Sequence, residues 1–428
     1  MAVPPEPAPA PEDATDALVD GDRTVARGTA QAALAHREFR IVWAGTFASN
    51  IGTWMQNVLL GAYGYTLTHS ATYVGLLFFA QLGPLLVLSN IGGVLADVLD
   101  RRRLLLITQL EQLVFSIVLG LLVTGGEPSR VLLFACVLVI GIGNALGAPA
   151  LSSILPTLVP KPDLPGAVSL QSVQMNLSRV IGPVIGASVY AAAGAAPVFL
   201  INAGTYLFAI VALLVVEYPR HPAARGTGGV LDRLAEGFRI ARADPLIWRV
   251  LVILFTMSLF SLAFVGLMPA IAATNFGIAP RSVDYGVLYA VFGFGAALGA
   301  VSVGTWFAAI PKARLVRPAM LAFAVVLAAF ALVRVPWAAF AIAPLLGYAY
   351  FVVITSLSTV LQSHIDDAVR GRVVALWIMG FGVTVPVGVL IGGALAHATS
   401  ITLVLVGGAV VAALLAAFAD LTAVGAPS

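Results

Sequence analysis

The chain has 428 residues, of which 60% are hydrophobic and only 10% are charged, whereas a typical soluble domain carries about 25% charged residues. A soluble fold is therefore excluded. The net charge is +3, and the basic residues are scattered between apolar segments, so nucleic-acid binding is not expected. The single cysteine, Cys136, lies in an apolar run. No intrachain disulfide and no cysteine-based metal site is expected.

The first 22 residues contain five prolines and six acidic residues but no basic residue. Such a segment cannot bury enough apolar surface to fold, so we expect residues 1–36 to form a disordered cytoplasmic tail. The segment also lacks the basic start and apolar core of a signal peptide. The first membrane span is therefore expected to direct insertion.

Twelve apolar segments follow, each long enough to cross a bilayer as a helix. They cover about residues 41–67, 72–96, 104–123, 131–155, 166–191, 197–216, 248–274, 285–310, 315–335, 337–361, 373–398 and 400–420. The expected fold class is an all-α polytopic membrane protein.

The Lys and Arg residues predict how these spans are oriented, because cytoplasmic loops are enriched in them. With both termini in the cytoplasm, 19 of the 23 basic residues fall on the cytoplasmic side and three in external loops. The remaining one, Arg179, lies inside a span. We therefore predict a multi-pass protein of the bacterial inner membrane with both termini cytoplasmic.

A hydrophilic stretch separates six spans from six. We predict an N-terminal half at 37–216, a cytoplasmic linker at 217–247, a C-terminal half at 248–421 and a short cytoplasmic tail at 422–428. Apolar residues at helical spacing in the linker predict an amphipathic helix, which either lies among the lipid headgroups or connects the halves in solvent. These residues are Leu231, Leu234, Ala235 and Phe238.

Three pairs of identical residues recur at nearly constant separation between the two halves. The pairs are Trp43 and Trp248, Asp163 and Asp367, and Pro183 and Pro386, which are 205, 204 and 203 positions apart. A transporter built from two parallel repeats would produce such offsets.

The loop after the second span carries the most specific motif. It reads Gly93-Val-Leu-Ala-Asp97-Val-Leu-Asp100-Arg101-Arg102-Arg103 and resembles the G-x-x-x-D-R-x-G-R-R/K loop of the major facilitator superfamily. Val98 and Asp100 depart from that pattern, and the D-R-R-R form resembles the enterobactin-exporter-like group of bacterial efflux transporters. The resemblance implies a cytoplasmic gate motif that latches the two halves, formed by Gly93, Asp97, Asp100, Arg101 and Arg102. A segment that only fixes topology is the alternative.

Two further motifs support this resemblance. Asp367, Arg370, Gly371 and Arg372 look like the D-x-x-R-G-R loop that enters the eleventh span in that group. Gly182, Pro183 and Gly186 in the fifth span resemble an exporter motif, G-P-x-x-G-G, with Ala187 replacing the last glycine. Gly-Pro pairs also occur because they bend and pack membrane helices, which is the alternative. The resemblance implies two pseudo-symmetric six-helix halves around a central cavity.

A transporter needs polar groups that face each side of the membrane in turn. Polar or small residues form one stripe on the first span and another on the fifth, spanning about 100° and 140° of helical arc. The resemblance places spans 1, 2, 4 and 5 around the cavity. The substrate-cavity candidates are Asn50, Thr53, Trp54, Asn57, Asn144, Gln171, Gln174, Ser178 and Arg179. Gln56 and Asn202 are instead expected to form interhelical hydrogen bonds.

Charged side chains inside membrane spans are costly and therefore candidates for function. Glu111 is the only acidic residue well inside a predicted span, about 12 Å inward from Arg103 at 1.5 Å per residue. We predict that Glu111 couples transport to protons. For Glu111 and Arg179 alike, the alternative is a structural ion pair or polar anchor within the first half.

Conventional enzyme sites are not found. The five histidines lie in or near predicted loops and tails, and no nucleotide-binding or metal motif is present, so we expect no enzyme, no cofactor and no metal. We interpret the chain as a monomeric secondary transporter in the lipid bilayer. It is expected to export small amphipathic compounds, such as a drug, siderophore or secondary metabolite, by proton antiport. The alternatives are an importer or lipid flippase on the same fold, and a non-transporting anchor or assembly partner.

Overall fold

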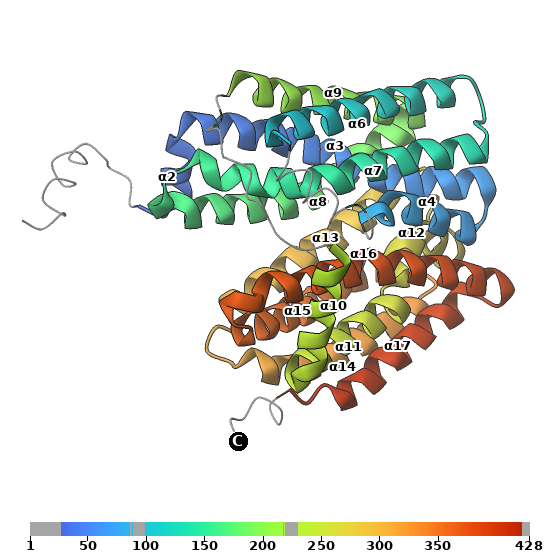
Figure 1. Ribbon diagram of the computed structural model, residues 1–428. Coiled ribbons are helices and arrows are strands. Elements are labelled where there is room, and N and C mark those ends of the chain that lie inside the picture. Colours follow the sequence, from blue (N-terminus) through green and yellow to red (C-terminus); the bar gives the residue numbers. More distant parts are fainter. Residues whose placement is uncertain (1–26, 86–87, 89–98, 217, 219–229, 422–428) are drawn as a thin grey trace, which may run out of the picture.

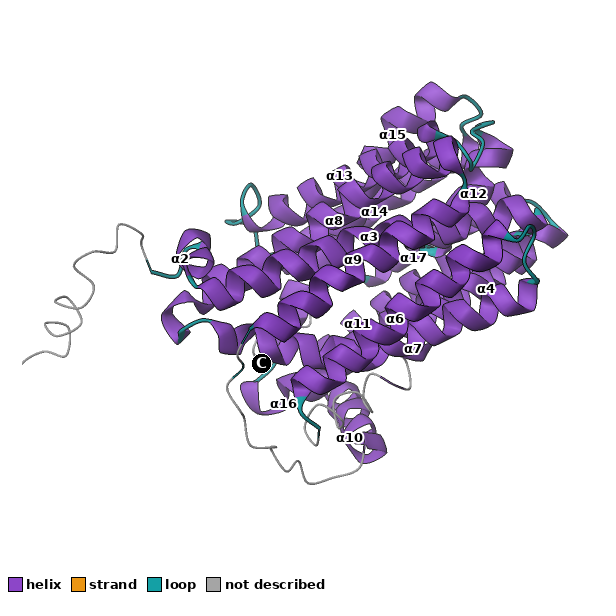
Figure 2. Cartoon of the chain, turned by 90° about the horizontal axis from the view of Figure 1, so that it is seen from above, coloured by secondary structure: helices purple, strands orange, loops and turns teal. Residues whose placement is uncertain are grey.

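The apolar segments of the chain fold into long helices, because a backbone inside lipid must satisfy its hydrogen bonds within its own segment. The computed structural model describes residues 27–421 except 86–87, 89–98, 217 and 219–229. Within that part of the chain there is no β-strand. Most long helices run roughly along one common direction, as two views at right angles show (Figures 1 and 2).

The N-terminal helices, α2 to α9, occupy one side of the bundle (Figure 1). Within this group α3 packs on α8 and α9, and α6 packs on α7 and α9. Side-chain caps begin several of the helices: Ser70 accepts a hydrogen bond from the backbone N–H of Tyr73 at the start of α4. The bounds are α2 (Ala30–Ala35), α3 (Arg37–Thr68), α4 (Ala71–Leu82), α6 (Arg101–Thr124), α7 (Arg130–Ile154), α8 (Leu164–Ala193) and α9 (Ala195–Val215).

The C-terminal helices, α11 to α17, form the other side. In this group α15 packs on α13 and α14, α14 on α17, and α11 on α16. A break at Ser261 and Leu262 divides one apolar stretch into α11 and α12, and Ser261 Oγ at that break donates to Gly408 O of α17 at 2.8 Å. The bounds are α11 (Pro245–Phe260), α12 (Ala263–Asn275), α13 (Val283–Gly304), α14 (Lys312–Leu332), α15 (Pro336–His364), α16 (Asp367–Ala398) and α17 (Ile401–Phe418).

Nine helical segments in the described ranges are long and apolar enough to cross a membrane, with α11 and α12 counted as one. The twelve expected spans are therefore not confirmed one by one. Helices α3 and α8 are long enough but more polar, and α4 is followed only to Leu82. Because α3 and α8 carry the two predicted polar stripes, their lower hydropathy comes from the candidate cavity residues.

Glycines let the two helix groups approach closely. The groups meet where α8 packs on α13 and where α4 packs on α16. A Cβ added to Gly286 of α13 would collide with Ala187 and lie 3.0 Å from Pro183 O of α8. A Cβ at Gly393 of α16 would lie 2.6 Å from Ala71 O of α4. Larger side chains at these positions would force the helices apart.

The prediction that residues 1–36 form a disordered tail is wrong for residues 30–35. Residues 30–35 form α2, in which Thr29 Oγ1 accepts a hydrogen bond from Ala32 N at 3.2 Å. Ala32 and Ala33 are buried, and α2 packs on α8. This alanine-rich segment folds because it has an apolar surface to cover. Residues 1–26 and 422–428 lie outside the described residues.

The eighth predicted span is also too long. Helix α13 ends at Gly304 rather than near residue 310, and Trp306 is 72% exposed. The turns that follow are held by Lys312, whose Nζ donates to Ile310 O at 3.0 Å. Helix α13 therefore ends before the apolar run does, and Lys312 binds backbone carbonyls of the turns that follow it.

An amphipathic helix is present in the linker region, as α10 (Val230–Ala243). In Figure 1 it crosses the direction of the long helices, and it packs on α16 and α11. Arg372 Nη1 donates to Glu236 Oε1 at 2.9 Å, and the ring of Phe238 lies edge-on to Trp248 at 5.5 Å. These contacts tie α10 to the C-terminal helices.

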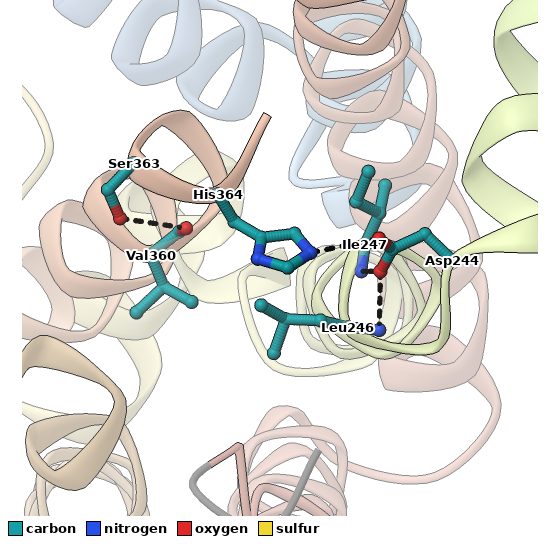
Figure 3. A network of polar contacts seen from close by, with 6 residues as sticks. All are labelled: Asp244, Leu246, Ile247, Val360, Ser363 and His364. Carbon is teal, nitrogen blue, oxygen red and sulfur yellow. Dashed lines mark hydrogen bonds and ion pairs between the residues drawn. The ribbon is translucent and has the colours of Figure 1, made fainter. Parts of the chain in front are cut away.

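The start of α11 is fixed by an aspartate and a histidine (Figure 3). Asp244 Oδ1 accepts hydrogen bonds from Leu246 N and Ile247 N at 2.8 and 3.0 Å, and Asp244 Oδ2 lies 2.8 Å from His364 Nε2. Burial opposes ionisation of Asp244, but these hydrogen bonds and His364 outweigh that effect. The pKa of Asp244 is consequently lowered from its ordinary value.

The N-terminal helices contain a pair of the same kind. His36, the residue before α3, places Nε2 at 2.8 Å from Asp163 Oδ2, at the start of α8. Pro183 and Pro386, one of the pairs at constant offset, both lie inside helices, α8 and α16. Related features thus recur at related places in the two groups, which is the arrangement expected of parallel repeats.

Candidate substrate cavity and coupling site

A cavity of about 300 Å³ lies between the two helix groups. Helices α3, α4, α7 and α8 line it on the N-terminal side, and α12 and α13 line it on the C-terminal side. The N-terminal wall carries the amide groups together with the rings of Trp54 and Phe78, and Tyr285 and Tyr289 stand on the C-terminal wall. The cavity therefore has amide groups on one side and aromatic rings on both sides.

Five of the nine predicted cavity residues line this cavity: Asn50, Thr53, Trp54, Asn57 and Asn144. Asn57 Oδ1 accepts a hydrogen bond from Gln81 Nε2 of α4, another lining residue. The stripe on α3 faces the cavity because its residues recur at helical spacing and so share one side of the helix.

The other four predicted residues lie on α8 and are not among the lining residues. Gln174 is buried and its Nε2 donates to Thr46 Oγ1 at 3.1 Å. Ser178 is fully buried, and Gln171 is half-buried. Met175 alone from α8 lines the cavity. The polar side chains of the α8 stripe therefore do not line the cavity, in contrast to those of α3.

The exporter-type motif lies where α8 meets two other helices. A Cβ at Gly182 would lie 2.6 Å from Trp54 Cβ, and one at Gly186 would lie 3.0 Å from Met55 Cα, both on α3. Pro183 O faces Gly286 of α13. The motif thus holds α8 against α3 on one side and against the C-terminal helices on the other.

The guanidinium of Arg179 lies between two aromatic rings. Its Cζ is 5.0 Å from the ring centroid of Trp54 in α3 and 5.0 Å from that of Phe351 in α15. The hydroxyl groups of Tyr289 and Tyr350 are within electrostatic range. An arginine at this depth costs about 2.5 to 3.5 kcal/mol on insertion scales, and two cation–π contacts offset part of that cost. The site joins both helix groups.

Glu111 lies inside the N-terminal group, against α7. Both of its carboxylate oxygens are buried and have no hydrogen-bond partner in the described part of the chain. A Cβ at Gly143 of α7 would occupy the position of the carboxylate, so the glycine makes room for it. Glu111 and Arg179 form no ion pair: the carboxylate has no polar partner among the described residues, and the guanidinium contacts the rings of Trp54 and Phe351.

Tyr206 of α9 connects the region of Glu111 with the cavity. The buried phenol interacts electrostatically with Glu111, and its hydroxyl lies 3.4 Å from Thr53 Oγ1. Thr53 lines the cavity. A series of oxygen-bearing side chains therefore leads from the cavity toward the buried carboxylate.

The expected interhelical role of Gln56 and Asn202 is confirmed. Asn202 Nδ2 donates to Gln56 Oε1 at 2.8 Å, and Ser116 Oγ donates to the same oxygen at 3.0 Å. The three side chains come from α9, α3 and α6, and all are buried. This polar network joins three helices within the N-terminal group.

The predicted gate motif is described only in part, because Gly93 and Asp97 lie outside the described residues. Asp100 Oδ1 accepts a hydrogen bond from Arg103 N, and α6 begins at Arg101. Arg102 donates to Leu213 O and Leu214 O at 2.8 and 2.7 Å and lies over the ring of Tyr218. A cation is favoured at this carboxyl end of α9. Arg102 thus ties α6 to α9 within the N-terminal group.

The second-half loop motif is also described only in part. Asp367 is the first residue of α16, but the surroundings of Asp367, Arg370 and Gly371 lie outside what the structure describes. Arg372, which binds Glu236 of α10, connects the motif to the linker helix.

Three residues of the site were not singled out from the sequence. Gln81 could have been found, because a lone amide in an apolar span is a candidate on the same ground as Asn144. Tyr206 and Phe351 carry no such signal. Aromatic residues are common in these apolar segments, and only the packing shows which of them contact Thr53 or Arg179.

Comparison with known proteins places the chain among transporters. The family described as transmembrane secretion effector, of the major facilitator type, matches residues 28–426. The Enterobactin exporter EntS of Escherichia coli O1:K1 / APEC is 29% identical over 349 residues, which cover 80% of this chain and 81% of the relative. The same protein of Shigella boydii serotype 18 matches with the same identity and coverage.

Solved structures share the fold. A bacterial homolog of the human lysosomal transporter Spinster, inward-facing and unoccupied, has a TM-score of 0.73 at 16% identity and covers 90% of this chain and 97% of that chain. The nucleoside transporter NupG has a TM-score of 0.69 at 12% identity, with 90% and 99% covered. These likenesses show the major facilitator fold expected from the sequence.

Proposed function

Because the chain belongs to the transmembrane secretion effector family of major facilitator transporters, we propose that it exports small amphipathic compounds across the inner membrane by proton antiport. The cavity between the two helix groups is the observation that carries this proposal. Its amide groups suit the hydrogen-bonding groups of such a compound and its aromatic rings suit the apolar body. The relatives named as enterobactin exporters support the direction of transport and a siderophore or similar metabolite as cargo.

Alternating access requires that the two helix groups close on one side of the cavity and part on the other. With both termini in the cytoplasm, Gly286 and Gly393 lie toward the external ends of α13 and α16. The tight packing at these glycines then closes the external side. Opening of this packing is the step that releases cargo outward, and the α10 linker remains on the cytoplasmic side.

Glu111 is the proposed proton site. Its buried carboxylate has no hydrogen-bond partner among the described residues, and an unpaired charge in apolar surroundings is costly. Proton binding removes that charge. Tyr206 and Thr53 lie between Glu111 and the cavity, so cargo that displaces Thr53 or its hydrogen bonds would alter the surroundings of the carboxylate.

The test uses everted membrane vesicles with an imposed pH gradient and a hydrophobic fluorescent dye. We expect wild-type vesicles to concentrate the dye and an uncoupler to abolish the uptake. Glu111→Gln should reduce gradient-driven uptake to the level of vesicles without the protein while dye binding to the purified variant is retained. Glu127→Gln, at an exposed position between α6 and α7, is the matched control and should behave as wild type.

Two results would contradict the proposal. If wild-type vesicles take up no dye, or if only right-side-out vesicles concentrate it, the proposal that the protein exports its cargo is wrong. If the Glu111→Gln protein still concentrates dye against the pH gradient as wild type does, the residue is a structural anchor in the N-terminal group and the proton site lies elsewhere.

A further inference from the structure

The centre of the bundle holds a positive charge, on Arg179, that no carboxylate in the described ranges neutralises. Arg179 forms no ion pair and donates no hydrogen bond within the described part of the chain, and its buried Nε has no acceptor. The carboxylate that the sequence predicts inside a span, Glu111, also has no polar partner in the part of the chain that is described. An uncompensated cation at this depth is costly to keep. Its presence requires a reason other than stability.

The surroundings leave the hydrogen-bonding capacity of Arg179 unused. Trp54 and Phe351, each 5.0 Å from Cζ, contact the guanidinium through their rings, which attract a cation but accept no conventional hydrogen bond. All three residues lie near the middle of their helices, α8, α3 and α15. The rings therefore hold the guanidinium in place at the centre of the bundle while its N–H donors remain available.

Arg179 adjoins the cavity. Trp54, which contacts the guanidinium, and Tyr289, which is within electrostatic range of it, both line the cavity. Met175, one turn before Arg179 on α8, lines it too. Arg179 itself is not completely buried. The guanidinium therefore lies directly beside residues of the cavity wall.

We propose that Arg179 binds an anionic group of the cargo and that the cargo is consequently an amphipathic oxyanion, such as an organic carboxylate or sulfonate. This inference rests on the proposed export function and narrows its substrate class. The planar fork of an arginine pairs with two oxygens of an oxyanion. Trp54 and Tyr289 then receive the apolar body, and the amides of α3 and α7 bind its remaining polar groups.

The two rings also link binding to conformation. Trp54 belongs to the N-terminal helices and Phe351 to the C-terminal helices. Arg179 also belongs to the N-terminal helices. When the groups move apart on the cytoplasmic or external side, the ring of Phe351 moves away from the guanidinium and that cation–π contact is lost. A bound oxyanion replaces that contact and biases the equilibrium between the two states.

The test measures binding of a charged and a neutral form of one scaffold, naphthoate and naphthamide, to the purified full-length protein in detergent. Wild type should bind naphthoate more tightly than naphthamide. Arg179→Gln should weaken naphthoate binding by about tenfold or more, as expected for a lost charge-assisted hydrogen bond, and leave naphthamide binding unchanged. Arg179→Lys should retain part of the preference.

The matched control is Arg281→Gln. Arg281 also lies over an aromatic ring, that of Tyr190 at 5.7 Å, but it is exposed and outside the cavity. This variant should bind both compounds as wild type does. Thermal unfolding of each variant identifies loss of fold, and the preference of wild type for naphthoate tests the proposal even where Arg179→Gln does not fold.

Three outcomes would overturn the proposal. The first is wild-type protein that shows no preference for naphthoate. The second is an Arg179→Gln protein that binds naphthoate as wild type does. The third is equal loss of both compounds, which would make Arg179 a packing residue. Binding is measured without a proton gradient, so failure of export in vesicles would not decide this test.

Discussion

The two helix groups share an architecture but differ in the side chains that they bury. The N-terminal group contains the network of Gln56, Ser116 and Asn202 together with Glu111 and Arg179. The C-terminal group contains an aromatic cluster instead, in which the rings of Phe264, Phe292, Phe323 and Tyr350 lie 5.7 to 6.4 Å apart. No charged side chain is buried in the C-terminal group within the described residues.

Polar groups at membrane depth are costly. The amides of the network are held by hydrogen bonds, whereas Glu111 and Arg179 have none among the described residues. The aromatic cluster packs as a rigid apolar core within the C-terminal group. We propose that the two groups have different tasks in transport. Recognition and coupling are thus proposed to lie in the N-terminal group, with the C-terminal group moving against it.

The largest effect is expected at the contact between the groups. Gly286→Leu places a side chain against Ala187 and Pro183 O of α8, where no space exists. Overpacking of this kind costs about 1 to 3 kcal/mol, so the closed contact should open and dye transport in vesicles should fall by about tenfold or more. Cysteines introduced at the external end of α8 should at the same time become more accessible to a thiol reagent.

The control for this substitution lies on the same helix. A Cβ at Gly304 of α13 has no neighbour within 4 Å, so Gly304→Leu should leave transport and labelling close to wild type. If Gly286→Leu transports as well as Gly304→Leu, the contact is not tight and the proposed external closure is wrong.

A smaller effect is expected in the polar network of the N-terminal group. Asn202→Leu removes the donor to Gln56 Oε1, and interhelical hydrogen bonds in membranes contribute about 0.6 kcal/mol on average and up to about 1.7. We expect a loss of about 1 kcal/mol in the free energy of unfolding in detergent. Asn176→Leu is the control, because Asn176 donates only within its own helix, to Ser172 O. Equal losses in both variants would show that the network does not stabilise the group.

The smallest effect is expected at the His–Asp pair of the C-terminal group. Asp244→Asn keeps the cap of α11 but removes the charge beside His364, and such partly exposed pairs contribute about 0 to 1 kcal/mol. Because the pKa of Asp244 is lowered on folding, its charge contributes stability above the ordinary value of 3.8, and that contribution is lost as the pH falls below this value. The difference in thermal stability between wild type and Asp244→Asn should therefore be largest near neutral pH. A difference that persists or grows in acid would contradict this account.

The sequence predicted the elements and part of the site. Apolar runs predicted the helices, and the spacing of polar residues on α3 placed Asn50, Thr53 and Asn57 on the side that lines the cavity. The sequence-based predictions are wrong where local pattern and packing disagree. The predicted disordered tail includes residues 30–35, because the sequence alone does not show what these alanines pack against, whereas in the fold α8 packs on them.

The sequence by itself determined the class of protein, the helix-forming segments, the amphipathic linker helix and the family motifs. These features depend on hydrophobic length, charge and spacing along the chain, which neighbouring residues set without reference to the rest of the fold. Only the tertiary structure decided that Arg179 lies between Trp54 and Phe351 rather than beside Glu111. Those contacts join residues far apart in the chain, and the rotation of each helix about its axis is set by close packing at glycines such as Gly143, Gly182 and Gly286.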